Sequence, residues 1–73
     1  MAYEALVRRV DLHRIVLEEH AEGTYIFVFR KPDSPWPEED YLQDNTEIAM
    51  RACERNYGVP RDAWKEIPNP GLM

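Results

Sequence analysis

Tyr25-Ile26-Phe27-Val28-Phe29 is an unbroken run of β-branched and aromatic residues, a composition typical of a buried β-strand. Successive side chains of a strand point to opposite faces, so the three aromatic rings share one face and the two aliphatic side chains share the other. Both faces therefore need to be covered. A chain of 73 residues with one good helix covers one face of a small sheet well. We expect a second copy, a partner or the chain's own ends to cover the other.

The residues before and after this run predict a β-hairpin. Residues 12–17 read as a half-buried strand, and a switch of the apolar positions within it predicts a bulge or twist. The polar residues 18–23 predict the hairpin turn, and residues 24–31 form the second strand. Residues 2–10 fit both a helical stripe and a strand, and we favour a strand from about Val10.

The segment after the hairpin contains a break and then a helix. Prolines at positions 32, 35 and 37 end the sheet, because proline lacks the backbone donor that a ladder needs. Residues 38–43 fit either the first turns of a helix or a loop with a short third strand at 41–43. Asp44 and Glu47 have the spacing of a capping box and predict a helix over residues 45–57.

The end of that helix is well marked. Gly58 suits the left-handed position after the last turn, and Pro60 prevents continuation. Residues 60–66 read as a short second helix that presents Trp64. The sequence thus predicts a single α+β domain over residues 1–67: an antiparallel hairpin, with or without a short third strand, packed against one main helix and a short C-terminal helix. Residues 68–73 are predicted to form an extended tail.

Composition limits the classes of partner. The chain has 9 basic and 14 acidic residues and a formal net charge of -5, which disfavours nucleic acid because that affinity depends on cations. No stretch approaches the ~20 apolar residues of a membrane-spanning helix, so we expect no membrane partner. Cys53 is the single cysteine and cannot form an internal disulfide, which favours a reducing cytoplasm.

No pattern of residues points to catalysis or to a bound cofactor. Cys53 lies in the middle of the predicted helix beside Glu54, where nothing stabilises a thiolate. His13 and His20 are the only imidazoles and are well separated, which disfavours a metal site. The acidic cluster lacks the glycine and ligand spacing of a calcium loop; it comprises Glu38, Glu39, Asp40, Asp44 and Glu47. We therefore expect no catalytic, cofactor-binding or metal-binding residues, and no enzyme.

The doubly apolar strand instead favours a role in binding protein. We expect a small cytosolic protein-interaction module that self-associates through the hairpin sheet as a homodimer, or binds another protein. Trp36, held between two prolines, suits either an interface anchor or a lid on the hairpin. The candidate interface comprises Tyr25, Ile26, Phe27, Val28, Phe29, Trp36 and Trp64.

Two segments suggest a second interpretation. EGTYIFVF, followed later by DNTEIAMRA, resembles the layout of HicB-type antitoxins over roughly residues 15–57. The Gly-Gly before the tyrosine and the Gly-Cys after the loop in that family are missing here. The resemblance implies an antitoxin-like or regulatory protein that neutralises or modulates a basic protein partner.

Overall fold

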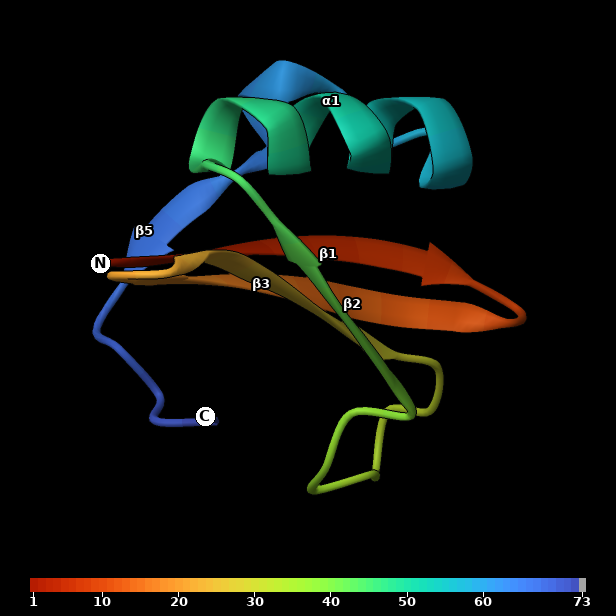
Figure 1. The fold of residues 1–73 in the computed structure, drawn as a ribbon. Coiled ribbons are helices and arrows are strands. Elements are labelled where there is room, and N and C mark those ends of the chain that lie inside the picture. Colours follow the sequence, from red (N-terminus) through yellow and green to blue (C-terminus); the bar gives the residue numbers. More distant parts are fainter. Residues whose placement is uncertain (73) are drawn as a thin grey trace.

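The sheet contains five antiparallel strands in the computed structural model, which describes residues 1–72, and their order is β4-β3-β2-β1-β5 (Figure 1). Helix α1 (Thr46–Tyr57) covers one face of this sheet, and the C-terminal segment runs along the opposite face. A 3-10 turn, η1 (Arg61–Ala63), leads from the helix to the last strand. The strands are β1 (Ala2–Arg9), β2 (Leu12–His20), β3 (Gly23–Phe29), β4 (Glu39–Gln43) and β5 (Lys65–Ile67).

The α+β class is confirmed, but the sheet is larger than the predicted hairpin. Residues 2–9 are a strand from the start, and the segment that fitted either a helix or a strand forms β4. The predicted second helix over residues 60–66 is wrong. Only Arg61–Ala63 turn helically, and β5 then pairs with β1 through Ala2 and Ile67. Local signals in the sequence could not reveal a pairing between opposite ends of the chain.

The β2-β3 hairpin is tighter than predicted. Its ladder continues to the pair His20 and Gly23, so that only Ala21 and Glu22 form the turn. Gly23 has a backbone φ of +147°, a conformation that residues with a Cβ atom rarely adopt. The ladder between β1 and β2 shifts register between Leu6 and Arg9, where two residues of β1 stand against one of β2. The extra residue is in β1, whereas the sequence predicted the irregularity within residues 12–17.

Helix α1 ends as predicted but begins with a different cap. The side chain of Asn45, not of Asp44, accepts a hydrogen bond from the Ile48 N–H at 2.9 Å. Gly58 is left-handed with a φ of +71°, and its N–H donates to the Glu54 carbonyl. The helix face toward the sheet carries the small buried residues Ala49, Ala52 and Cys53.

The core has a part on each face of the sheet. On the helix side, Ile15, Leu17, Ile26 and Val28 pack with α1. On the far face, Val16, Phe27 and Phe29 form a second cluster, against which Tyr25, Ile67 and Leu72 pack.

A single chain therefore covers both faces of β3, and of the three covers expected for the second face the chain's own end is the one that the structure shows. Ile26, Phe27, Val28 and Phe29 are each at most 2% exposed in the single chain. The reason is that the C-terminal segment and the Arg14 guanidinium, 3.9 Å from the centre of the Phe29 ring, supply the missing cover. Within residues 1–72, no helix has the length and apolar character needed to cross a membrane.

Candidate protein-binding surface

The predicted interface residues are mostly inside the molecule. Four residues of the β3 run are buried, and Tyr25 is half-buried. Trp64 packs against the helix-side core, and its indole N–H is buried without a hydrogen-bond partner among the described residues. Trp36 is the exception, because 69% of it is exposed in the loop before β4. The structure therefore does not bring the seven residues together on one surface.

A different surface is exposed at the edge of the sheet. β4 pairs with β3 along one side and is the last strand of the sheet, so its outer main-chain groups face away from the ladder. Its two large apolar side chains, Tyr41 and Leu42, are 46% and 49% exposed. Sequence reasoning missed both residues. The signal in the sequence that could have identified them is the possible short third strand at 41–43, which contains both residues.

The two apolar side chains of β4 serve opposite faces of the sheet. Tyr41 lies opposite Ile26 on the helix side, where Gln43, Ala52 and Tyr57 help to line a hollow between β4 and α1. Leu42 lies opposite Tyr25 on the far face. A strand added beside β4 would therefore find an apolar contact on each side of the sheet.

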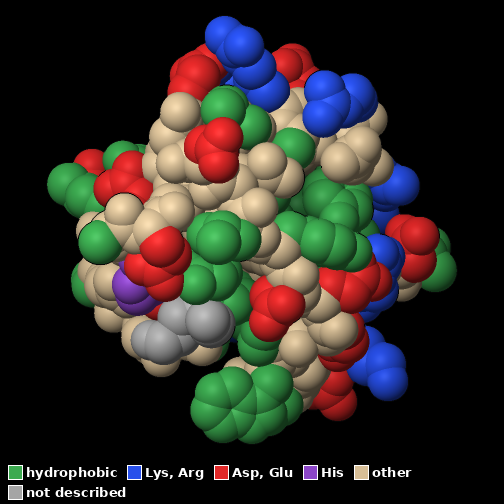
Figure 2. Space-filling view, viewed as in Figure 1, with side chains coloured by type: hydrophobic (Ala, Val, Ile, Leu, Met, Phe, Trp, Pro, Cys, Tyr) green, Lys and Arg blue, Asp and Glu red, His purple; other side chains and the backbone are tan. Residues whose placement is uncertain are grey.

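Carboxylates surround this edge. Asp40 and Asp44 are exposed and form no ion pair within residues 1–72, and Glu38 is exposed beside them. Figure 2 views the molecule from the β4 side and shows acidic and hydrophobic side chains along the course of this strand, with basic side chains above it over α1 and to its right. The edge that is open for pairing is thus acidic.

Glu39 is the one β4 carboxylate with a described cationic partner. The Arg30 Nε–H donates to Glu39 Oε2 at 2.7 Å, and this hydrogen bond holds the pKa of Glu39 below its usual value. The Tyr41 hydroxyl donates to the other oxygen at 2.8 Å, which raises the pKa of Tyr41 to about 12. Both contacts fix side chains on the helix side of β4, so this face of the edge is preorganised.

The groups considered for chemistry are dispersed. Cys53 is buried in α1, and the loss of solvent raises the pKa of its thiol to about 12. His13 and His20 lie near opposite ends of β2. In the acidic cluster, Glu39 and Glu47 each bind arginine. Among residues 1–72, no three His, Cys, Asp or Glu side chains are grouped closely enough to hold a metal ion.

No family model, curated protein or solved structure matches this chain. The resemblance to HicB-type antitoxins therefore stays a prediction from the sequence, and any function has to be argued from the surface itself.

Proposed function

We propose that this chain is a small, non-catalytic protein-interaction module that binds an extended segment of a partner along β4. The observation that carries the proposal is the open edge of β4 with Tyr41 and Leu42 exposed on its two faces. A segment that adds as a sixth strand gains main-chain hydrogen bonds from the edge and side-chain contacts from both residues. The single unpaired cysteine fits a cytoplasmic setting for this module.

Charge at the edge favours a basic partner. Self-pairing of β4 would bring Glu38, Asp40 and Asp44 of two copies together, and each copy carries a formal net charge of -5. With Tyr41 at the two-fold axis, for example, Glu38 of one copy lies opposite Asp44 of the other. Like charges directly opposite one another destabilise a ladder, whereas lysine or arginine opposite Asp40 stabilises it. A basic extended segment is therefore the occupant that fits.

The open, acidic edge of β4 also supports the second candidate function, an antitoxin-like or regulatory role. An acidic edge that captures a strand of a basic protein could cover a functional surface of that protein. The partner has the same chemistry in both cases. The regulatory role additionally requires that the partner's own activity falls when the complex forms.

The test uses two capped nine-residue peptides, one of alternating valine and lysine and one of alternating valine and glutamate. Titrated into the 15N-labelled chain, the lysine peptide should shift the amide signals of residues 39–43, and its affinity should fall as salt rises. The glutamate peptide should not bind.

The matched variants are Leu42→Lys, on the edge, and Ile48→Lys, which changes a 37% exposed residue on α1. Leu42→Lys should weaken binding of the lysine peptide about tenfold or more, while Ile48→Lys leaves it unchanged. Equal binding of both peptides, or shifts centred away from β4, would refute the proposal. A wild-type dimer that Leu42→Lys abolishes would show that a second copy, not a basic segment, is the occupant.

A further inference from the structure

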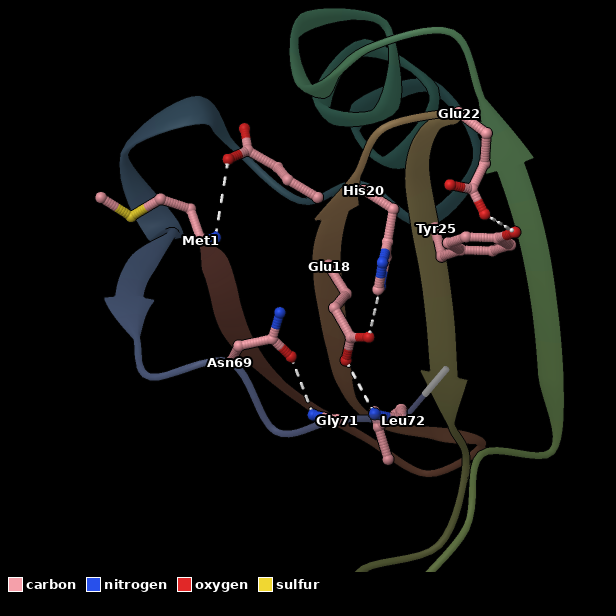
Figure 3. A network of polar contacts seen from close by, with 9 residues as sticks. Met1, Glu18, His20, Glu22, Tyr25, Asn69, Gly71 and Leu72 are labelled. Carbon is pink, nitrogen blue, oxygen red and sulfur yellow. Dashed lines mark hydrogen bonds and ion pairs between the residues drawn. The ribbon is translucent and has the colours of Figure 1, made fainter.

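The C-terminal segment closes over the far face of the sheet. Residues 68–72 cross in front of β2 (Figure 3). The Leu72 side chain packs against the cluster of Val16, Phe27 and Phe29. The Leu72 N–H donates to Glu18 Oε2 at 2.9 Å, and the Glu18 side chain has no exposed surface. The other oxygen of Glu18 lies 2.6 Å from His20 Nε2. A buried carboxylate and an apolar floor thus recognise one backbone N–H and one aliphatic side chain.

The floor of this groove belongs to the sheet and does not need the segment for its position. Val16 pairs with Phe27 in the ladder between β2 and β3, and Glu18 pairs with Tyr25 in the same ladder. The segment itself is held mainly at its end. Residues 68–71 are exposed, and the Gly71 N–H bonds within the segment, to Asn69 Oδ1 at 2.8 Å. The floor of the groove is therefore positioned by the sheet, and the 68–72 segment contacts it mainly through Leu72.

The direction of the chain just before Leu72 depends on one left-handed glycine. Gly71 has a φ of +69°, and a Cβ atom built there would meet no atom within 4 Å. A residue other than glycine would disfavour this conformation through its backbone preference alone, without a clash. Pro68 and Pro70 favour an extended segment, and five extended residues reach up to ~17 Å beyond Ile67.

We propose that the far-face groove is a peptide-binding site whose second occupant is the 68–72 segment of another copy of this chain. Reciprocal exchange fills both grooves with the contacts seen in the single chain, and the two copies are related by a two-fold axis. The occupant is specific because the groove already binds this sequence. The site is independent of β4, which lies at the other edge of the sheet from β5.

The experiment is light scattering of the full chain over a concentration series, with variants at Gly71 and at the anchor. Gly71→Val disfavours the left-handed backbone conformation at this position and should lower the dissociation constant of the dimer at least about tenfold. Gly71→Asn, which tolerates that conformation, should behave nearly as the wild type. Leu72→Ala and Leu72→Asp remove the anchor and should leave a monomer with an unchanged circular dichroism spectrum.

Isotope-filtered NOEs between labelled Leu72 of one copy and unlabelled Phe27 of another should identify the exchanged contact in the Gly71→Val dimer. Leu42→Lys, at the β4 edge, should leave this dimer intact. A Gly71→Val chain that stays monomeric at every concentration would overturn the proposal, as would a dimer that persists in the folded Leu72→Ala chain.

Discussion

Replacing Gly23 by alanine should destabilise this protein severely, and the reason lies in how closely β4 approaches the β2-β3 turn. A Cβ atom built on Gly23 would stand 2.3 Å from the carbonyl oxygen of Gln43 and 3.2 Å from Leu42 Cδ1. The backbone φ of +147° is itself unfavourable for alanine. The substitution therefore strains one residue and pushes the end of β4 away from β3.

The size of the effect follows from these two costs. A residue in a sparsely populated backbone region costs about 1–3 kcal/mol. Forcing extra volume into a packed site costs about 1–3 kcal/mol more. The sum, about 2–6 kcal/mol, is a large part of the ~4–11 kcal/mol expected as the total unfolding free energy of a chain this long.

Urea unfolding followed by far-UV circular dichroism measures the loss, with Gly58→Ala as the matched control. Gly58 also has a positive φ, +71°, but its nearest contact to a built Cβ is the flexible Arg9 Nη1 at 3.9 Å. The control should lose only about 1 kcal/mol. Equal losses for the two variants would refute the reasoning, because the Gln43 carbonyl would then not limit the space at Gly23.

Three further predictions follow from single groups. Asn45→Ala should cost about 1 kcal/mol in urea unfolding because it removes the helix cap, whereas Asp44→Ala should cost much less; the reverse order would mean that Asp44 is the cap. Cys53 should react with a thiol reagent only at the rate of unfolding, because burial raises its pKa to about 12; fast labelling at pH 8 in native buffer would contradict this. Tyr41 should ionise near pH 12 in a spectrophotometric titration and nearer pH 10 in Glu39→Gln. Since its folded pKa is raised, its contribution to stability is present below pH 10 and is lost as the pH rises toward 12, so a tyrosine signal complete by pH 11 would count against the hydrogen bond.

The sequence predicted the elements whose signals are local. Gly58 with Pro60 marked the end of α1, the alternation in residues 12–17 marked β2, and the run after Gly23 marked β3. Each of these depends on backbone preference or on side-chain period within a few residues. The short strand β5 has no such signal, because its three residues are extended through pairing with β1.

The binding surface was harder to predict for the same reason. The apolar run of β3 was assigned to a candidate interface, because nothing in the sequence of residues 68–72 indicates that Leu72 packs on the cluster that contains Phe27. Tyr41 and Leu42 became candidates only when the strand order placed β4 at an edge. Sequence pattern gives the faces of a strand, but the position of that strand in a sheet depends on contacts between distant residues.

The pairing of β1 with β5 determines how the protein responds to mechanical load. A force that pulls the two ends of the chain apart first loads the contact of Leu72 with Glu18. Once that contact opens, the force acts on neighbouring residues at one end of the β1-β5 ladder, because the strands are antiparallel and Ala2 lies opposite Ile67. Such a load opens the hydrogen bonds one after another instead of shearing them all at once. β5 would therefore peel away at low force, while the meander of β1 to β4 stays intact.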